Sequence, residues 1–455
     1  MRTSIKLLLV ALPLLLAGCA LTPEYQRPTM MIPSDWDNAV PGHAAAVDET
    51  WWQRFGSAEL AELMAEAMVA NQDLAVALAR IEQARATARG ASAGRLPDVS
   101  AGLSAGRSRS DGRTRESGQA ELSIAYELDL WRANAAAAQA AQARLLASAY
   151  DLEAAQLVLQ AELATTYFRA LALKSRLAIA RDNLAIARQL LELVQIRADL
   201  GAATELELAQ QRTAVLSLEA ELPSLQLQLE QAQHALAVLL GRPPQGFAIR
   251  GSGLAELRLP TVAPLQPASL LERRPDIRRA EAQLAAAHAD IGVARAALYP
   301  SLRLSASGGV ADLLTGGSAS FASLIGALSQ SIFDGSWRRS QVTLSEARRD
   351  ELAAQYVRTV LTGFREVEDA LAAVQASEAR AAALSQAAAQ AQLAYRLALV
   401  RYEAGTQDLL NLLDSQRSRL QAEDGLVQAE LSRFLGTVDL FKALGGSWES
   451  PEHTT

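Results

Sequence analysis

An internal repeat of about 204 residues constrains this chain more than any other feature. The two halves contain the related stretches NQDLAVALARIEQARATARGASAGRLPDVSAGLSAG and RPDIRRAEAQLAAAHADIGVARAALYPSLRLSASGG, in which an aspartate (Asp73 or Asp276) lies 24 residues before a proline (Pro97 or Pro300). The later landmarks LDLW and FDGSW, RADLG and RYEAG, and LLG and ALGG keep the same order and similar spacing. Shared composition alone would not preserve that spacing, so the chain is predicted to be a duplicated structural unit.

Each half is predicted to form a helix, a strand, a loop, a second strand, a long helix and, after a break, a further helix. The first helix covers 57–95 in one half and 269–298 in the other, and it stops before a proline, which cannot continue a helix. The long helices cover 133–198 and 338–402. The segment 242–267 holds five prolines and three glycines and is predicted to link the two halves.

The composition favours long, closely packed helices. Half of the residues are hydrophobic but only 5% are aromatic, and alanine and leucine dominate. Alanine loses no side-chain entropy in a helix and lets neighbouring helices approach closely. The net charge of −7, with no run of Lys or Arg, argues against nucleic-acid binding. The single cysteine, Cys19, excludes a disulfide framework and a thiolate metal site.

The long helix over 133–198 carries two apolar stripes. Each repeats every seven residues, and the two lie roughly 130° apart on a helical wheel. This arrangement suits a helix with a neighbour on each side, as in a curved wall; a helix inside an ordinary bundle is the alternative. The first stripe consists of Leu163, Ala170, Leu177, Leu184 and Leu191 with companions Leu159, Leu173, Ala180, Ala187 and Val194, and the second of Val158, Ala172, Ile179, Ile186, Leu193 and Leu200.

Four segments alternate apolar and polar residues with the period of two expected of β-strands. They lie at 99–106, 120–128, 301–307 and, least regularly, 324–332, and each pair is joined by a polar or glycine-rich loop of about a dozen residues. Strands of about ten residues with one apolar face are typical of transmembrane β-barrels, but four strands cannot close a barrel. Either they form a soluble sheet or several chains pool their strands; three chains would supply twelve, and two chains remain possible.

The N-terminus, MRTSIKLLLVALPLLLAGCA, has the pattern of an export signal. Arg2 and Lys6 precede an apolar core over 7–16 that is too short to span a bilayer as a helix. The ending LAGC resembles a bacterial lipobox, so Cys19 is predicted to be lipidated and to become the first mature residue; an ordinary secretory signal with a chance cysteine is the alternative. Ala20 replaces the aspartate that signals inner-membrane retention in many lipoproteins, which favours the outer membrane.

Together these motifs resemble the outer membrane factor (TolC) family, nearest to its OprM/NodT-like lipoprotein branch. The resemblance covers nearly all of the mature chain and is carried by the lipobox, WWQRFG, ANQDL, RRPDI, LDLW and FDG, RYEAGTQDLLNLLDSQR and the terminal ALGG. It implies a mainly α fold with a four-stranded β contribution per chain: a homotrimer with a 12-stranded transmembrane β-barrel that continues into a long periplasmic α-helical barrel. LDLW would then mark the end of the β-barrel. The expected divisions are 1–18 (signal), 19–55 (N-terminal periplasmic segment), 56–241 (first repeat), 242–267 (linker), 268–446 (second repeat) and 447–455 (tail).

The resemblance also implies a periplasmic gate just after the second glycine turn. The matching residues are Leu410, Asn411 and Asp414, and Asn411 departs from relatives that carry a second acid there. Three Asp414 carboxylates around a narrow lumen would repel one another and favour cations. The alternatives are that Asp414 is a solvated helix residue and that Leu410 belongs to a packing stripe.

The two turns are expected to dock partner proteins. The candidate residues are Arg197 and Gly201 in RADLG and Arg401 and Gly405 in RYEAG, although glycine at a helix end also has a purely structural use. The implied partners are a periplasmic adaptor (membrane fusion protein), an inner-membrane exporter of the RND type and outer-membrane lipids.

The sequence predicts no catalytic or metal site, because the four histidines are scattered and no Gly-rich phosphate loop follows a strand. The chain is therefore expected not to be an enzyme and to need no cofactor beyond the lipid on Cys19. The predicted function is the outer-membrane exit duct of a tripartite efflux system for small molecules such as drugs, passive and powered by its partners. The alternatives are the duct of a type I protein secretion system and a non-pore, lipid-anchored periplasmic coiled-coil scaffold.

Overall fold

The computed structural model describes residues 21–38, 50–262, 264, 266–314, 317 and 319–446. The predicted signal 1–18, the predicted lipidation site Cys19 and the tail 447–455 lie outside the described residues. The chain divides into two compact units, which we name by their contents. The strand unit comprises 1–30, 78–151 and 276–359, and the tip unit comprises 31–77, 152–275 and 360–455.

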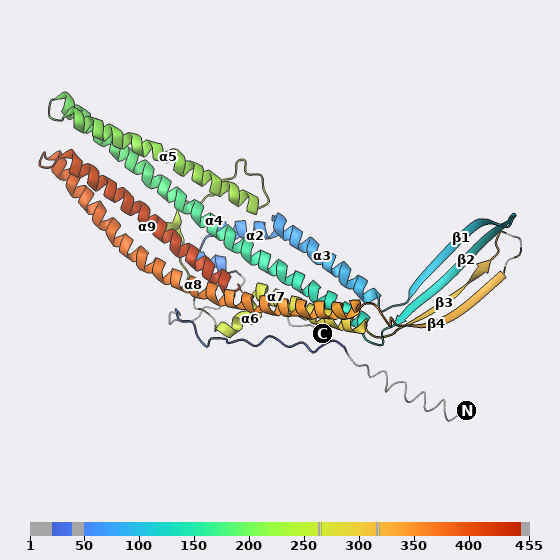
Figure 1. The fold of residues 1–455 in the computed structure, drawn as a ribbon. Coiled ribbons are helices and arrows are strands. Elements are labelled where there is room, and N and C mark those ends of the chain that lie inside the picture. Colours follow the sequence, from blue (N-terminus) through green and yellow to red (C-terminus); the bar gives the residue numbers. More distant parts are fainter. Residues whose placement is uncertain are drawn as a thin grey trace. The chain divides into compact units, whose positions relative to one another are not determined.

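Four antiparallel strands form one sheet in the strand unit, in the order β1 (Asp98–Ser110), β2 (Arg113–Leu128), β3 (Ser301–Ala311) and β4 (Ala319–Ser329). The two strands of each repeat are therefore neighbours, and β2 joins the repeats by pairing with β3. Strands β1 and β4 are the outer strands (Figure 1). The four predicted strands are confirmed, and each outer strand has one unpaired edge within the described chain.

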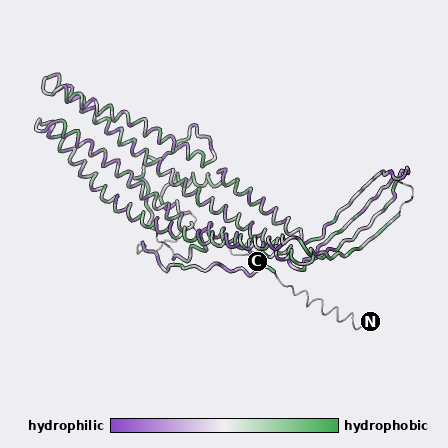
Figure 2. The backbone as a smooth tube through the Cα atoms, in the orientation of Figure 1, coloured by the Kyte–Doolittle hydropathy of each residue, from purple (hydrophilic) through white to green (hydrophobic). Residues whose placement is uncertain are grey.

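The register of the sheet collects the alternating apolar residues on one face. Ile124 in β2 lies opposite Val99 in β1 and Ala306 in β3, so all three share a face. The other face is polar, and serine pairs bridge neighbouring strands there, Ser100 to Ser123 at 2.7 Å and Ser307 to Ser323 at 2.9 Å. Along the strands hydrophobic and hydrophilic residues accordingly follow one another at short intervals (Figure 2). Each strand has at least the length expected for a membrane-crossing strand.

The predicted loop between the first two strands is wrong. Strands β1 and β2 continue through most of SRSDGRTRESG and meet at Asp111 and Gly112, whose φ angles are 52° and 77°. Positive φ at both central residues is the geometry of a type I′ turn, which Asp-Gly favours. In the second repeat the strands likewise enter the predicted loop, because β3 reaches Ala311 and β4 starts at Ala319, while β4 ends at Ser329, before the predicted limit of 332.

The two long helices are confirmed. Helix α4 (Ala133–Asp199) and helix α8 (Trp337–Glu403) each run for 67 residues. Helix α4 exceeds its predicted range by one residue at the C-terminal end, and α8 by one residue at each end. In the part of the chain within the tip unit, the first apolar stripe of α4 is buried from Leu159 to Val194 apart from Leu173 and Leu191, which are half-buried. The second stripe is more open, with Val158 and Leu200 exposed.

The single helix predicted at the start of each repeat is interrupted. Helices α2 (Ala58–Ala70) and α3 (Gln72–Ala93) are separated by Asn71, whose backbone is extended and whose side-chain oxygen accepts hydrogen bonds from the N–H groups of Asp73 (2.9 Å) and Leu74 (3.1 Å). In the second repeat, η3 (Pro267–Ser269) and α6 (Leu270–Arg273) precede Arg274, also extended, and then α7 (Pro275–Ala296). Both interruptions place a polar side chain between helices.

In the tip unit, α4 folds back into α5 (Glu205–Leu239), and α8 folds back into α9 (Leu409–Ala443). Each pair is an antiparallel hairpin, and both hairpins turn at the same end of this unit (Figure 1). Beside the turns, residues of all four helices form one apolar core, which includes Val194, Leu208, Tyr402 and Leu412. The duplication is thus visible as two matching hairpins that share a core.

Away from the turns, the tip unit has an aromatic core. The short helix η1 (Trp51–Phe55) places Trp51 against Phe441 with ring centroids 5.0 Å apart, and Phe55 against Phe168 at 4.9 Å. The predicted linker 242–267 is largely irregular, with a short turn η2 (Leu254–Glu256). The linker is held by hydrogen bonds from the backbone N–H groups of Arg250 and Gly251 to Glu59.

Candidate functional site

The two predicted docking turns have the same backbone geometry. Gly201 and Gly405 adopt φ angles of 72° and 73°, a left-handed conformation that glycine adopts without steric cost. At the first turn the N–H groups of Gly201 and Ala202 donate to the carbonyl oxygens of Ala198 (2.9 Å) and Arg197 (2.7 Å). The second turn repeats this with Gly405 to Tyr402 (3.0 Å) and Thr406 to Arg401 (2.9 Å). Both are Schellman motifs, which satisfy the last carbonyl groups of α4 and α8.

The arginine of the first turn bridges the two hairpins. The guanidinium of Arg197 donates hydrogen bonds to the carbonyl oxygens of Tyr402 (3.2 Å) and Glu403 (3.0 Å) at the end of α8. It also lies over the Tyr402 ring, 4.6 Å from the centroid. A cation at the C-terminus of a helix interacts favourably with the helix dipole and with the free carbonyl groups. Arg197, predicted as a docking residue, therefore also joins the turns of the two repeats.

The arginine of the second turn has no such role within one chain. Arg401 is exposed, and its guanidinium makes no hydrogen bond or ion pair with the residues that the structure describes. Its carbonyl oxygen accepts hydrogen bonds from the N–H and hydroxyl groups of Thr406 (2.9 and 3.0 Å). The structure thus leaves one cationic side chain of the two turns available to another molecule.

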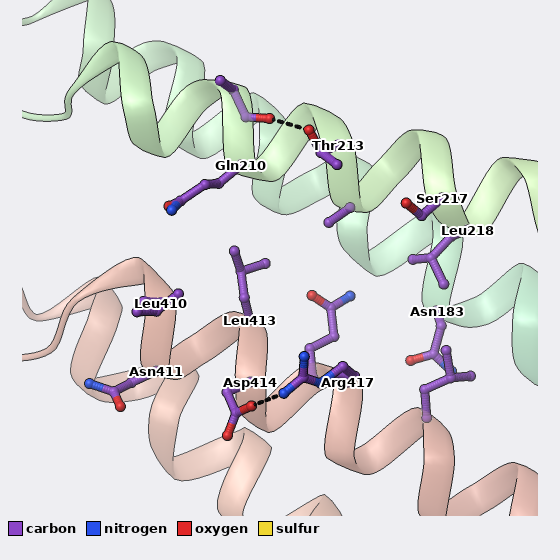
Figure 3. Close-up of a pocket in the computed structure, with 14 residues that line it drawn as sticks. Asn183, Gln210, Thr213, Ser217, Leu218, Leu410, Asn411, Leu413, Asp414 and Arg417 are labelled. Atoms are coloured by element: carbon purple, nitrogen blue, oxygen red, sulfur yellow. Dashed lines mark hydrogen bonds and ion pairs between the residues drawn. The ribbon is translucent and has the colours of Figure 1, made fainter.

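A groove lies between α5 and α9 next to the turns, with a cavity volume of about 820 Å³. Figure 3 shows α5 on one side and α9 on the other, with Asn183 of α4 between them. All three predicted gate residues line this groove. The lining residues are Asn183, Ala209, Gln210, Thr213, Ala214, Ser217, Leu218, Leu410, Asn411, Leu413, Asp414, Gln416, Arg417 and Leu420.

Each gate candidate has a defined local environment. Asp414 forms an ion pair with Arg417, one turn further along α9, at 2.5 Å, and both side chains are largely exposed (Figure 3). The backbone N–H and side-chain amide of Asn411 donate to Asp408 at 2.9 and 2.8 Å, so Asn411 supports the N-terminal cap of α9. Leu410 is exposed at the start of the same helix. Asp414 therefore carries a negative charge into the groove together with a neighbouring positive charge.

The duplication supplies a neutral counterpart to Asp414. Helix α5 begins after Thr204 and α9 begins after Asp408, and each of these residues caps its helix through a side-chain oxygen. Gln210 and Asp414 both lie six residues after the cap, and both line the groove. The two repeats therefore place an amide and a carboxylate at equivalent positions.

Charged side chains that sequence reasoning did not identify connect α4 to the second hairpin. Arg419 on α9 donates to Asp182 on α4 at 3.2 Å and to Glu423 at 2.8 Å, and its guanidinium lies 5.2 Å from the centroid of the Tyr395 ring. Burial raises the pKa of Tyr395, although the Arg419 charge opposes this shift. The bond between Arg419 and Asp182 joins residues 237 positions apart, and no local sequence pattern predicts such a pairing.

Neither metal chemistry nor a helical membrane span is indicated in the part of the chain that the structure describes. No group of three His, Cys, Asp or Glu residues is placed there to hold a metal ion. None of the described helices is long and apolar enough to cross a membrane.

Comparisons with known proteins agree on one family. The family model "Outer membrane efflux protein" matches residues 63–242 and again residues 267–446, which correspond to the two repeats. The chain is 39% identical to the pyoverdine export outer membrane protein OpmQ of Pseudomonas putida, with 98% of each chain covered. It is 36% identical to the outer membrane protein OprJ of Pseudomonas aeruginosa, covering 97% of this chain and 95% of OprJ. The solved structure of the outer-membrane channel OprN superimposes with a TM-score of 0.87 at 30% identity, covering 94% of this chain and 100% of that one.

Proposed function

Because the chain belongs to the outer membrane efflux protein family and is an outer-membrane channel of a tripartite efflux system, we propose that three copies of it enclose one continuous conduit. The observation that carries this proposal is the sheet of the strand unit. It has one apolar face, one polar face and two unpaired edges. In lipid each unpaired backbone group costs several kcal/mol, so a four-stranded sheet must be completed by other strands.

Three copies would complete it as a 12-stranded barrel with the apolar face toward lipid and the serine-rich face toward the lumen. The helices support the same arrangement. The first apolar stripe of α4 is satisfied inside the chain, while Val158 and Leu200 of the second stripe remain exposed for a neighbouring helix. A wall of helices with neighbours on both sides would form the periplasmic part of the conduit. A non-pore scaffold would leave the apolar face of the sheet unexplained.

We propose that the turns at Gly201 and Gly405 receive a periplasmic adaptor. A Cβ atom added at either glycine would meet no atom within 4 Å, so both turns are open to a partner. The exposed guanidinium of Arg401 could donate hydrogen bonds to that partner, whereas the guanidinium of Arg197 is already engaged. The adaptor would connect the channel to an inner-membrane exporter, proposed to be of the RND type, which supplies the energy for transport.

Leu410, Asn411 and Asp414 are proposed to form the periplasmic gate. In a ring of three copies, three Asp414 carboxylates would alternate with three Gln210 amides. Arg417 partly neutralises each carboxylate, so the gate would favour cations without excluding other solutes. Asn411 would contribute mainly by holding the first turn of α9.

The cargo is proposed to be small molecules, and Cys19 is proposed to carry a lipid that anchors the chain in the outer membrane. OpmQ, one of the most similar relatives, is named for the export of pyoverdine, which favours small-molecule export over protein secretion. The groove between α5 and α9 is lined by aliphatic, hydroxyl and amide side chains, with Asp414 and its ion-pair partner Arg417 as the charged residues. Such a wall lets solutes pass, and selection would rest with the exporter and the adaptor.

Single-channel conductance in a planar bilayer tests the proposal. The purified wild-type protein should give small, cation-selective currents. Asp414→Ala should weaken the cation selectivity, because it removes a carboxylate that attracts cations and leaves the charge of Arg417 unneutralised, and it should enlarge the current, because alanine occupies less of the narrow lumen. Gln210→Ala is the matched control at the equivalent position of the first repeat, and it should leave the charge selectivity unchanged. Equal selectivity in the wild type and Asp414→Ala would retain the channel and refute the gate, whereas a folded oligomer without conductance in any variant would contradict the conduit.

A further inference from the structure

The hairpin turn between β1 and β2 is positively charged, although the whole chain has a net charge of −7. It lies at the end of the sheet remote from α7 (Figure 1). The strand register divides its arginines between the two faces of the sheet. Arg107 and Arg109 share the apolar face with Val99, whereas Arg113 and Arg115 lie on the serine-rich face. Each face of this turn therefore carries one pair of arginines.

The two arginines on the apolar face differ in their contacts. Arg107 is ion-paired across the strands with Glu116, to which its Nε donates a hydrogen bond at 2.9 Å. Arg109 lies opposite Thr114 and is exposed, and its guanidinium makes no hydrogen bond or ion pair within the described ranges of the chain. Glu116 balances only one of the two positive charges. A cationic group without a partner therefore lies on this face.

The apolar face ends at these arginines. On β2 this face holds uncharged residues from Leu128 to Gly118, and the next residue on it is Glu116. The ten residue steps from Gly118 to Leu128 span about 34 Å along a strand, and a tilt of about 40° gives a height of about 26 Å. The apolar band of a transmembrane barrel is about 25 Å tall. Arg107, opposite Glu116, therefore lies where the lipid headgroups would begin.

An apolar turn covers the same face beside the arginines. The N–H of Leu313, just after β3, donates to the carbonyl oxygen of Gly118 at 3.1 Å. A Cβ atom at Gly118 would point to the apolar face and lie 2.9 Å from Cγ of Leu314 and 3.2 Å from Cβ of Leu313. The two leucines thus lie on this face, and they are 45% and 53% exposed. Gly118 is opposite Ala105, two residues before Arg107, so cationic and apolar groups are neighbours here.

We propose that this surface binds a phosphorylated lipid of the outer leaflet: Arg107 and Arg109 bind its phosphate group, and Leu313 and Leu314 contact its acyl chains. Guanidinium groups form paired, charge-assisted hydrogen bonds with phosphate oxygens. The inference rests on the proposed conduit, because only in a closed barrel does the apolar face meet lipid, and only with the helices in the periplasm does this turn reach the outer leaflet. Three copies would then carry one such site each.

Titration of the full-length trimer with diphosphoryl lipid A tests the proposal. The protein is purified in a neutral detergent and freed of bound lipid, and native mass spectrometry counts the lipid molecules retained by each trimer. Arg107→Ala combined with Arg109→Ala should weaken the apparent affinity by about tenfold, which corresponds to about 1.4 kcal/mol. The matched control, Arg113→Ala combined with Arg115→Ala, removes the same charge from the same turn but from the other face, and it should bind as the wild type does.

Three outcomes would overturn the lipid site. Equal losses in the two double variants would reduce it to a general attraction between the turn and anions. Equal binding of lipid A and its dephosphorylated form by the wild type would exclude recognition of the phosphate. If inorganic phosphate displaces the lipid while Leu313→Ser combined with Leu314→Ser leaves the affinity unchanged, the arginines bind free phosphate and not a lipid.

The failure of this inference can be separated from the failure of the proposed function. If every variant runs as a trimer on a native gel and conducts ions in a planar bilayer, but all bind lipid A alike, the lipid site is refuted and the conduit stands. A wild-type protein that forms neither a trimer nor a conducting channel would refute the conduit, and the lipid site with it.

Discussion

The two hairpin turns have the same backbone but use their arginines differently. Each helix ends in a Schellman motif, with a glycine at φ 72° in RADLG and at 73° in RYEAG. Arg197 bonds to two carbonyl groups of the other repeat, whereas Arg401 meets none in the described chain. The difference follows from connectivity. The first repeat has the second beside it, but the second repeat needs another molecule to provide the equivalent neighbour.

A second comparison concerns two side chains of the tip unit, Asn71 and Arg274. Each donates a hydrogen bond to the last carbonyl group of a helix, and we call each contact a clamp. The side chain of Asn71 donates to the carbonyl oxygen of Leu239, the last residue of α5, at 2.9 Å. Arg274 occupies the equivalent place in the second repeat and donates to the carbonyl oxygen of Ala443, the last residue of α9, at 2.8 Å. Arg274 is also ion-paired with Glu366 at 2.7 Å, and its side chain is 8% exposed. The duplication therefore preserved the bond and replaced a neutral donor with a charged one.

The largest expected effect on stability is the difference between loss of the Arg274 clamp and loss of the Asn71 clamp. Arg274→Ala should lower the free energy of unfolding by about 2–4 kcal/mol, because it removes the charged hydrogen bonds of a buried guanidinium to Glu366 and to the carbonyl oxygen of Ala443, and leaves that helix-end carbonyl unpaired. Asn71→Ala should cost about 1–3 kcal/mol, since only neutral hydrogen bonds are lost. Differential scanning fluorimetry in detergent measures both. Equal losses in the two variants would show that the charge adds nothing to the clamp.

The contact between Glu59 and the linker should respond to pH. Burial raises the pKa of Glu59, but hydrogen bonds from the N–H groups of Arg250 and Gly251 and from the Tyr167 hydroxyl outweigh it and leave the pKa lowered. The folded state therefore binds this proton more weakly than the unfolded state. Its stabilisation is present above the ordinary carboxyl pKa and is lost as the pH falls through the lowered value.

Glu59→Gln should consequently reduce stability at pH 7 by about 1.5–3 kcal/mol, the contribution of charged hydrogen bonds. The difference from the wild type should shrink as the pH falls below about 4. Melting temperatures of the two proteins between pH 7 and pH 3 measure this. Glu62→Gln is the control, since Glu62 is a carboxylate in the same helix whose ion pair with Arg250 is exposed and contributes little. A difference that does not change with pH would exclude ionisation of Glu59 as its source.

The turn arginines should give the next effect. Arg197→Ala should destabilise the turns by about 1–2 kcal/mol through the loss of two hydrogen bonds and a cation–π contact. Arg401→Ala should cost close to nothing in a dissociated chain. Hydrogen exchange of the amides near the two turns, measured on monomer and on assembled protein, distinguishes them. If Arg401→Ala accelerates exchange only in the assembly, a neighbouring copy supplies the partner of Arg401. Equal acceleration by both variants in the monomer would contradict the difference between the two arginines.

The turn glycines should give an effect on stability no larger than that of Arg197→Ala, and a separate effect on export. Gly201→Leu and Gly405→Leu each force a left-handed conformation on a side chain, at a cost of about 1–2 kcal/mol. A Cβ atom at either position would meet no atom within 4 Å, so the trimer should persist in the membrane. Export of a fluorescent substrate should fall in Gly405→Leu if this turn docks the adaptor. Normal export in that variant would argue against docking there, and loss of the trimer would assign the defect to folding.

Long-range periodicity explains which parts of the fold were predictable. The stripes of α4 repeat over tens of residues, so both long helices were predicted to within one residue at an end. The hairpin at Asp111 and Gly112 was missed because eleven polar residues look like a loop, although Asp-Gly is itself a hairpin signal. The helix breaks at Asn71 and Arg274 depend on carbonyl groups of residues about 170 positions away. No local sequence pattern predicts such distant partners.

The N-terminal segment also makes contacts that no local sequence pattern predicts. Residues 21–38 have no regular secondary structure, yet Arg27 binds Glu281 at 2.8 and 2.9 Å, and Trp36 packs against Phe364 with ring centroids 6.0 Å apart. In the candidate site, the resemblance proposed the turns and the positions on α9 as functional, which stays a prediction. The bridge made by Arg197 and the pairing of Asp414 with Arg417 required the structure, because they depend on which side of each helix faces its neighbour.

The open edges of the sheet have a genetic consequence. Since the four strands of one copy cannot close a barrel, each channel would contain several copies, and one defective copy would impair the whole channel. A variant that folds and assembles but cannot open would disable every mixed channel that it enters, and it would act dominantly when made beside the normal protein. A variant that cannot present β1 or β4 would be excluded from assembly and would act recessively. Co-expression phenotypes would therefore sort defects of the gate from defects of the edges without purification of the protein.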